Sequence, residues 1–573
     1  MTSTPAAAVT ASLDDPRYYL ANFRCVLGWV AERHADLLAA PERAFLAGFA
    51  RLPEAAQALL VRMVMRRGEH FRTARLAYAE IGDTEAALAP LVAAGFVEAA
   101  PELDLATLFA QLRLPELRQA LAGEIAAAGL PRATPKAALL AALAPALVTP
   151  RRLAEWWPGA PDRVVRLTVM DTCDRLRLMF FGNLRQDWAE FVLAELGVQR
   201  FETVPFTADS RAFRCREEVD AYLALHRLRE RLEAGEPVAA LRAELPEVPA
   251  DNPWLMARRD RLLLALGRQA EREGDVEPAL SLYATAGWDK GASAEARIRR
   301  LRLLERQGRH AEAFALASPL AAAGRERAGA AAEAQALGRL LPRLARRLGE
   351  RVAPHPPEPA PNSLTLELEA SRASLGVERA VAAHLHRDSA PVHYVENALI
   401  TGLFGLLCWE ALFAPLSGAF FHPFHAGPAD LYREDFVARR RERFDACLAR
   451  LDDGSHAAAI RAAWRAKHGL ASPFVHWEAL DEALVERALA CLPAAHLRAC
   501  FERLLGDLRA NRAGLPDLVQ FYPEAAPGEP RYRLIEVKGP GDRLQDNQQR
   551  WLAFFRARGI PAAVCHVRWR EAP

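Results

Sequence analysis

Hydrophobic residues recur every three or four positions from about residue 16 to residue 350. This spacing puts them on one face of a helix, so it predicts a long helical region. Beyond residue 515 the spacing changes to two, which is typical of strands. The pattern there predicts strands over residues 516–522, 532–538 and 562–569 and an amphipathic helix over 542–558. We therefore expect a multidomain, mostly α chain that ends in an α/β domain.

A repeat is visible inside the helical region. Gly274 and Gly308 are 34 residues apart, and so are Ala279 and Ala313. This period resembles the tetratricopeptide repeat (TPR), a helix pair that buries its apolar face by stacking on a neighbouring pair. We therefore predict TPR-like helices within residues 147–350.

Two segments ahead of the repeat resemble DNA-binding modules. Residues 88–97 resemble the last helix and turn of a winged helix-turn-helix, within a helical region expected over 1–100. Residues 114–140 resemble an SAP module, which we place at 101–146. In that module Arg132 and Lys136 would face DNA phosphates at a helix start. The alternative is that both side chains are merely solvated.

A proline-rich stretch separates the repeats from the C-terminal domain. Five prolines fall in residues 351–361, and proline cannot continue a helix, so a stiff linker is expected over 351–364. The C-terminal domain is then expected over 365–573, with helices over 380–386 and 392–413. The apolar stretch 398–416 contains Glu410, which favours a buried helix over a membrane span.

Composition restricts the partners and the compartment. The 573 residues include 74 Lys and Arg and 72 Asp and Glu, a formal net charge of +2. A nucleic-acid surface must therefore come from local clusters of basic residues. The eight cysteines have no C-x-x-C spacing, and no signal peptide is recognised at the N-terminus. We expect reduced thiols in a cytoplasmic protein that does not enter a membrane.

Three residues near the C-terminus carry the candidate chemistry. Glu536 and Lys538 are two apart and so share one face of a strand, and Asp517 begins the strand that would face it. Buried without compensation, such charges would cost several kcal/mol. A bound divalent cation would compensate the negative charge, and oxygen ligands suit Mg²⁺ or Mn²⁺. An ordinary structural ion pair is the alternative reading.

Lys538 is one of only four lysines among the 74 cationic side chains. An amine can orient a water molecule and help to deprotonate it, whereas a guanidinium is bulkier and keeps its proton. The presence of lysine here therefore favours a catalytic role, although chance would also explain a single lysine.

Taken together, these motifs resemble a known nuclease domain. Pro516-Asp517, Glu536-Val537-Lys538 and Gln548-x-x-Trp551 resemble the virus-type replication–repair nuclease (VRR-NUC) domain of the PD-(D/E)xK superfamily. With the helical, SAP-like and TPR-like regions ahead of it, the whole chain resembles bacterial members of the Fanconi-associated nuclease family. The resemblance implies a nucleoid-associated, metal-dependent 5′ flap endonuclease and 5′–3′ exonuclease. Its substrate would be branched or flapped duplex DNA, and its role interstrand crosslink repair.

The resemblance also implies a set of site residues. Glu396 would join Asp517 and Glu536 as a catalytic metal ligand, and the backbone carbonyl of Val537 would complete the set. Glu410 is a rival for Glu396, and an acid before a helix is also explained by capping. Trp551 is expected in the core. Phosphate or DNA contacts are implied for Arg509, Arg512, Arg543 and Gln548.

Two other functions fit the same residues. A four-way junction resolvase or a restriction-type nuclease would use the same superfamily site. A non-catalytic helical-repeat scaffold that binds DNA would need none of the acidic residues. The intact set of Asp517, Glu536 and Lys538 therefore favours an enzyme.

Overall fold

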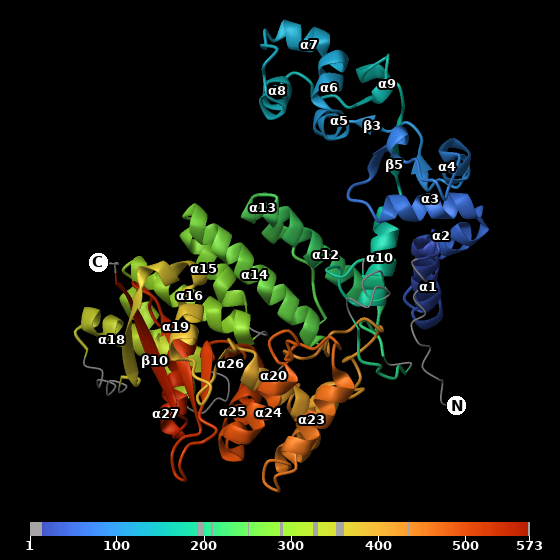
Figure 1. Ribbon diagram of the computed structural model, residues 1–573. Coiled ribbons are helices and arrows are strands. Elements are labelled where there is room, and N and C mark those ends of the chain that lie inside the picture. The colour runs from blue at the N-terminus through green and yellow to red at the C-terminus, as the bar shows by residue number, and fades with distance from the viewer. Residues whose placement is uncertain are drawn as a thin grey trace. The chain divides into compact units, whose positions relative to one another are not determined.

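The computed structural model describes residues 14–570 apart from 189, 192–193, 195–199, 208–209, 250, 287–289, 325–330, 351–359 and 434. The expected proline-rich linker thus lies largely outside the described residues. The chain forms two compact units (Figure 1). The N-terminal unit comprises Met1–Gln199, Phe206–Val219 and Phe421–Phe424, and the C-terminal unit comprises Arg200–Pro205, Asp220–Phe420 and His425–Pro573.

The N-terminal unit begins with helices and a small sheet. The helices are α1 (Tyr18–Arg33), α2 (Ala40–Arg51), α3 (Glu54–Val64) and α4 (Thr84–Ala93). The sheet has the order β1-β5-β2, built from β1 (His70–Arg72), β5 (Val164–Leu167) and β2 (Val97–Glu98). Helices are thus followed by a small sheet, and the winged form of the predicted helix-turn-helix stays a prediction. The central strand, however, comes from residues beyond the SAP-like segment, which the local pattern did not predict.

The SAP-like segment folds between β2 and β5. It contains α5 (Leu105–Gln111), α6 (Leu114–Ala120), α7 (Ala122–Ala127), α8 (Lys136–Leu143) and α9 (Leu153–Trp156). Strands β3 (Glu102–Leu103) and β4 (Arg151–Arg152) pair across its two ends. Leu108, Leu117 and Leu139 fill its core. Helix α10 (Met170–Phe181) follows β5 and packs on α1.

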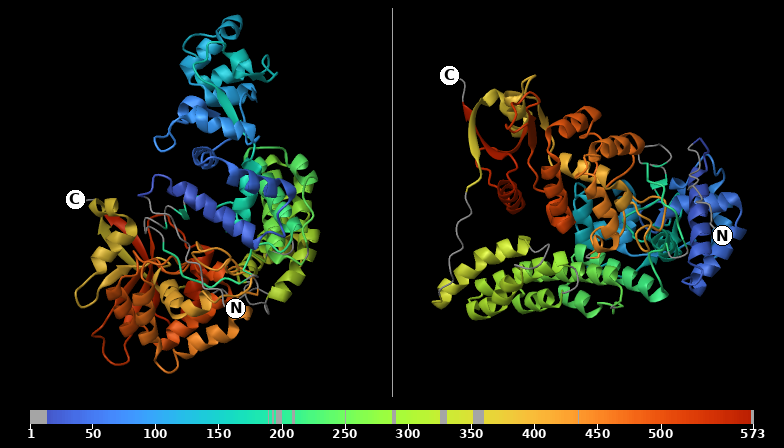
Figure 2. Two further views of the ribbon diagram at one scale, coloured as in Figure 1. Left: turned by 90° about the vertical axis from the view of Figure 1, so that its right-hand side faces the viewer. Right: turned by 90° about the horizontal axis from the view of Figure 1, so that it is seen from below.

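The repeat region forms a row of helices that lie side by side (Figure 2). They are α12 (Arg216–Glu233), α13 (Val238–Ala243), α14 (Pro253–Glu273), α15 (Val276–Thr285), α16 (Lys290–Arg306), α17 (His310–Gly324) and α18 (Ala331–Leu348). Gly274 and Gly308 follow the ends of α14 and α16 with φ of 87° and 73°. Ala279 and Ala313 are fully buried at equivalent positions. The predicted 34-residue period therefore corresponds to two successive helix pairs.

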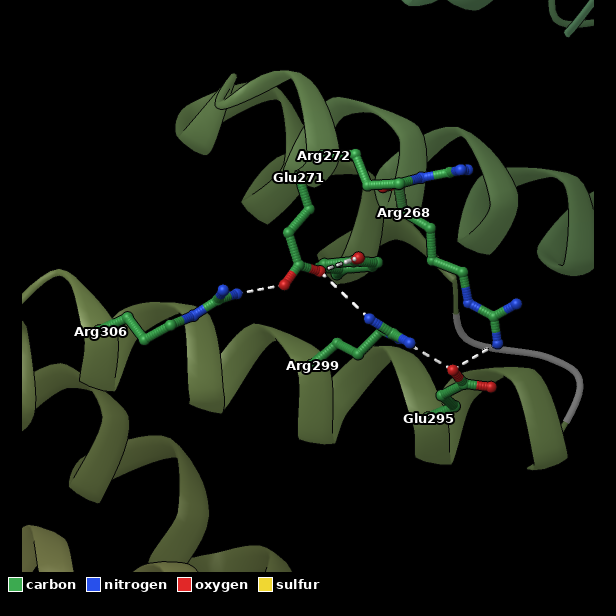
Figure 3. A network of polar contacts seen from close by, with 7 residues as sticks. Arg268, Glu271, Arg272, Glu295, Arg299 and Arg306 are labelled. Atoms are coloured by element: carbon green, nitrogen blue, oxygen red, sulfur yellow. Dashed lines mark hydrogen bonds and ion pairs between the residues drawn. The ribbon is translucent and has the colours of Figure 1, made fainter.

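Side-chain contacts hold α14 against α15 and tie this first helix pair to α16. A Cβ at Gly267 would lie 2.6 Å from the ring of Tyr283, so only glycine allows this approach of α14 to α15. Figure 3 shows that Glu271 and Glu295 are bridged by Arg299, at 3.4 and 2.8 Å. Two further arginines pair with these carboxylates, namely Arg268 with Glu295 and Arg306 with Glu271. These arginines therefore neutralise charge within the fold.

The nuclease-like domain is built on a five-stranded sheet with the order β6-β10-β9-β8-β7. The strands are β6 (Ser363–Glu369), β7 (Val392–Tyr394), β8 (Leu518–Phe521), β9 (Tyr532–Lys538) and β10 (Ala562–Arg570). β8 is antiparallel to β7 and β9, so the predicted hairpin is confirmed. β10 is parallel to β9 and β6, and α27 (Asp546–Ala557) connects β9 to β10.

Alternation along β9 divides its side chains between two faces. Ile535 and Val537 pack against Ala380 and Val381 of α19 (Val377–Leu385). Glu536 and Lys538 consequently point to the opposite face of the sheet. The helical connection β9–α27–β10 then places the active-site strand in the middle of the sheet.

The helix expected over residues 392–413 was wrong at its start. Val392–Tyr394 is strand β7, and helix α20 begins only at Leu399. Alternating branched and aromatic side chains favour the strand. Asn397, with φ of 53°, turns the chain between the two elements, a conformation that asparagine tolerates better than most residues.

Helices fill the sequence between Glu396 and Asp517. They are α20 (Leu399–Leu407), α21 (Trp409–Leu412), α22 (Arg441–Ala449), α23 (His456–Lys467), α24 (Glu482–Cys491), α25 (Ala494–Gly506) and α26 (Leu508–Asn511). All nine residues of α20 are buried, which confirms the predicted buried helix. Among the described residues, no helix combines the length and apolar character that a membrane crossing requires.

Candidate active site

The β8–β9 hairpin brings the three candidate side chains together. Leu518 pairs with Ile535, so Asp517 stands opposite Glu536. Asp517 Oδ2 accepts a hydrogen bond from the Val537 N–H at 2.8 Å. Lys538 Nζ lies 2.8 Å from Glu536 Oε1. Glu536 is 1% exposed, so its carboxylate is almost fully removed from water.

The end of strand β7 positions Glu396 close to Asp517. Tyr394 pairs with Leu518, and the Val395 N–H donates to the Asp517 carbonyl at 2.8 Å. Glu396 follows directly and is exposed, and its carboxylate accepts a hydrogen bond from the Tyr394 hydroxyl. Helix α20 has no side-chain cap bond at its start, so Glu396 makes no capping hydrogen bond to it.

The rival carboxylate lies on another element. Glu410 is an exposed residue of α21, and its charge acts on the Cys447 thiol of α22. By contrast, the charge of Glu396 raises the pKa of both Asp517 and Glu536. The structure thus places Glu396, and not Glu410, beside the hairpin residues.

The site holds more negative charge than its surroundings can solvate. Burial, followed by the charge of Asp517, raises the pKa of Glu536 to about 7. Burial also raises the pKa of Asp517, although the Val537 N–H and Lys538 oppose that shift. Because both acids hold their protons more tightly than usual, the cluster lacks compensating positive charge.

A divalent cation fits this donor set. Both carboxylate oxygens of Glu536 are buried, and Lys538 contacts only Oε1, so Oε2 is left without a partner among the described residues. Within the part of the chain that the structure describes, no three His, Cys, Asp or Glu side chains are already gathered closely enough to hold a metal. Asp517 and Glu536 therefore form the base of the candidate metal site, and Glu396 is the next available carboxylate. The predicted use of the Val537 carbonyl stays a prediction.

Two arginines predicted to bind DNA lie just before Asp517. Arg509 is on α26, and its guanidinium carbon lies 5.3 Å from the ring centroid of Tyr432. Arg512 donates a hydrogen bond to the Tyr432 hydroxyl. Both arginines therefore share an exposed tyrosine, which had not been singled out in the sequence.

The other predicted contacts near the hairpin differ in their surroundings. Arg543 is exposed in the turn before α27. The Gln548 side chain accepts a hydrogen bond from the Gln545 N–H at 2.8 Å and so caps its own helix. Trp551 is 1% exposed, as expected for a core residue. DNA contacts by Arg543 and Gln548 stay predictions.

In the SAP-like segment, Lys136 is the first residue of α8, and its Nζ donates to the Leu112 carbonyl at 2.8 Å. Arg132 is exposed in the preceding turn. Neither observation tests a phosphate contact, so both assignments stay predictions.

Residues that the sequence did not indicate also surround the candidate site. Tyr394 holds Glu396, and Asn397 Oδ1 accepts from the Leu515 N–H at 3.0 Å, tying the turn after β7 to the loop before Asp517. Glu378 of α19 adds negative charge, which acts on Asp517 and Tyr394. The alternation of residues 392–395 was the one available signal, since it indicates a strand ending beside Glu396.

Comparison with known proteins gives matches along the chain. Three family models match: FAN1, HTH domain over residues 17–98, Fanconi anemia-associated nuclease SAP domain over 102–156, and VRR-NUC domain over 451–569. The chain is 54% identical over 565 residues to the Fanconi-associated nuclease 1 homolog of Pseudomonas aeruginosa, covering 99% of this chain and 98% of that protein.

Solved structures agree. A crystal structure of paFAN1 bound to DNA with a two-nucleotide 5′ flap and a gap matches with a TM-score of 0.92 and 53% identity. That match covers 98% of this chain and 100% of the other. The complex with a one-nucleotide 5′ flap matches at 0.91 and 54% identity, covering 97% of this chain and 100% of the other.

Proposed function

The chain belongs to the Fanconi-associated nuclease family, and from this premise we propose that it cuts duplex DNA carrying a 5′ flap. The observation that carries the proposal is the meeting of Asp517, Glu536 and Lys538 across the β8–β9 hairpin. Support for the substrate comes from paFAN1, which is similar over nearly the whole chain and was crystallised with 5′ flap DNA.

Each side chain has a part in the proposed hydrolysis. Nucleases of this family use a divalent metal, here proposed as Mg²⁺ or Mn²⁺, which when bound polarises the scissile phosphate and acidifies a water molecule. Asp517 and Glu536 would hold the cation, and Glu396 would join them on release from Tyr394. The Lys538 ammonium, 2.8 Å from Glu536, is placed to orient the attacking water.

We further propose 5′–3′ exonuclease action and a role in unhooking interstrand crosslinks, in the cytoplasm on nucleoid DNA. The N-terminal helices and the SAP domain would grip duplex DNA through its phosphates without reading its sequence. Arg132 and Lys136 are the proposed contacts in the SAP domain, and Arg509, Arg512, Arg543 and Gln548 those near the hairpin.

A cleavage assay tests the proposal. The full chain, with Mg²⁺ or Mn²⁺, would be given 5′ flaps, 3′ flaps, four-way junctions and linear duplex. We expect cleavage of the 5′ flap to predominate. Asp517→Ala should abolish cleavage while DNA binding measured in EDTA stays unchanged, because the carboxylate is needed for the metal and not for the backbone grip. Glu410→Ala, the matched control, should cleave normally.

The outcomes separate the alternatives. Undiminished cleavage by Asp517→Ala would reject the site. Symmetric cuts in four-way junctions by a dimer would identify a resolvase instead. DNA binding with no cleavage of any substrate would leave only a scaffold.

A further inference from the structure

An exposed aromatic ring lies beside two arginines of the C-terminal unit. The Tyr432 side chain is 43% exposed, and the guanidinium carbons of Arg509 and Arg512 lie 5.3 and 6.0 Å from its ring centroid. We propose that Tyr432 is a stacking platform for an unpaired base of the 5′ flap, with the two arginines holding adjacent phosphates. This inference rests on the proposed function and names how that site would recognise the flap.

The turn that carries Tyr432 is anchored from inside the protein. Asp430 is 1% exposed and accepts hydrogen bonds from Arg439 at 2.6 Å and from Arg440 at 2.9 Å. Leu431 is also buried, and the Arg433 N–H donates to the Asp430 carbonyl. Burying an ion pair carries a desolvation cost. The fold thus fixes the residues on both sides of Tyr432 and leaves its ring outside.

This anchor also explains the run of arginines at residues 439–443. Arg439 and Arg440 pair with Asp430, and Arg441 pairs with Asp445 at 3.0 Å. Arg439 and Arg440 therefore hold the turn from inside and are not an open basic surface. Their contribution to DNA binding would be indirect, through the position of Tyr432.

The Arg512 guanidinium lies beside the ring, and neither of its two hydrogen bonds goes to an acidic side chain. Its hydrogen bonds go to the Tyr432 hydroxyl and to the Pro473 carbonyl, the latter at 2.9 Å. Among the residues that the structure describes, no carboxylate forms an ion pair with Arg512. A cation beside an exposed aromatic face is the combination that binds single-stranded nucleic acid, because every base offers a π-face and every link a phosphate.

The platform lies close to the catalytic residues along the chain. Asp517 comes only five positions after Arg512. An extended chain of that length spans at most ~18 Å, about five nucleotides at the 3.4 Å spacing of one DNA strand. A base on Tyr432 would therefore be a few nucleotides from the bond to be cut. Base pairs inside a duplex offer no open face, whereas an unpaired base does, and we take the unpaired base as the ligand of the ring.

The test measures binding of the full chain in EDTA, so that it does not depend on catalysis. The probe is a nicked duplex with a 5′ flap carrying one 2-aminopurine, compared with the same nicked duplex without a flap. Tyr432→Ala should weaken flap binding by roughly 5- to 150-fold, the range for loss of one base–aromatic stack. It should also relieve quenching of the 2-aminopurine and leave binding of the flapless duplex unchanged.

Tyr432→Phe is the matched control. It keeps the ring and removes only the hydrogen bond with Arg512, so stacking predicts near wild-type flap binding and quenching. Equal melting temperatures would show that both variants are folded. Wild-type affinity and quenching in Tyr432→Ala would overturn the proposal, as would an equal weakening for flapped and flapless DNA, which would indicate a duplex contact. A failure of the cleavage assay would refute the nuclease function without altering this binding result.

Discussion

The Glu536 carboxylate lies where the fold provides almost no water and, among the described residues, only Lys538 as a polar partner. The ammonium of Lys538 lies 2.8 Å away, yet burial and the charge of Asp517 still raise the pKa of Glu536 to about 7. A side chain in this state binds a proton or a cation near neutral pH. Carboxylates with a pKa shifted in this way are common at functional sites, where they lower the stability of the fold but bind protons or cations.

The stability of the metal-free chain should therefore depend on Glu536 in a predictable direction. The folded-state pKa of about 7 lies above the ordinary value of 4.5, so the folded state binds the proton more tightly than the unfolded state. The penalty is small well below pH 4.5 and grows as the pH rises toward 7. Glu536→Gln should thus raise the free energy of unfolding in EDTA by roughly 2–3 kcal/mol more at pH 8 than at pH 5.

Denaturant unfolding at the two pH values would measure this difference. Glu524→Gln is the control, since Glu524 is exposed in the same hairpin and should show no pH-dependent gain. Mn²⁺ should stabilise the wild type and not Glu536→Gln. A stabilisation equal at both pH values would mean that Glu536 has an ordinary pKa.

At the scale of elements, regular periodicity was predictable and long-range pairing was not. Strand β9 was predicted with its observed bounds, because its alternation is uninterrupted. Strand β7 was missed because it runs directly into the apolar residues of α20. Strand β5 takes its place between β1 and β2 only through tertiary pairing, so nothing local reveals it.

The residues of the candidate site likewise fall into those that local spacing indicates and those that only tertiary structure brings in. Asp517, Glu536 and Lys538 lie on one hairpin, so their spacing indicates that they meet. Tyr432 is 80 residues before Arg512, and no local pattern connects them. The sequence therefore identified the chemistry of the site but not the platform beside it.

Helix α20 follows the Glu396 turn and depends on glycine for its packing. A Cβ at Gly405 would lie 2.8 Å from Phe474 Cβ and 3.0 Å from Val475 Cγ2. Over-packing costs about 1–3 kcal/mol, against which alanine gains about 1 kcal/mol in helix propensity. Gly405→Ala should therefore lower the free energy of unfolding by up to about 2 kcal/mol.

The same substitution has a matched control on α18 of the same unit. Gly338 is exposed in the helix interior, with nothing within 4 Å of the added Cβ. Gly338→Ala should stabilise by roughly 0.4–1 kcal/mol. Opposite shifts in the two urea midpoints are expected, and a stabilised Gly405→Ala would show that α20 can move to accommodate a methyl group.

At the scale of the whole molecule, 74 cationic and 72 anionic residues nearly balance, and many of the described arginines form ion pairs with acidic side chains. The arginines of the repeat region in Figure 3 pair with Glu271 and Glu295. Net charge is therefore a poor guide to DNA binding in this chain. Binding of DNA phosphates must come from basic side chains that form no ion pair within the described part of the protein, as at Arg512.

The repeat helices and the nuclease-like domain belong to one compact unit. Arg339 of α18 pairs with Asp546 of α27 at 2.7 Å, and Gln335 accepts a hydrogen bond from Arg550 at 2.7 Å. The predicted domain start at residue 365 also falls inside β6, whose first residue is Ser363. A fragment intended to carry the nuclease alone should therefore begin before β6.

Residues 360–573 form such a fragment, which keeps all five strands and omits the helices that precede them. We expect it to retain metal-dependent cleavage but to show a reduced preference for 5′ flaps over linear duplex, because it keeps Tyr432 and loses the proposed contacts to the flanking duplex in residues 17–156. Removing one protein–phosphate interaction should make the slope of log K against log salt less negative by about 0.9. Fluorescence anisotropy at several salt concentrations, with the full chain as reference, would measure that slope. An unchanged slope and full flap selectivity in the fragment would confine DNA recognition to the nuclease domain and leave the N-terminal half without a part in it.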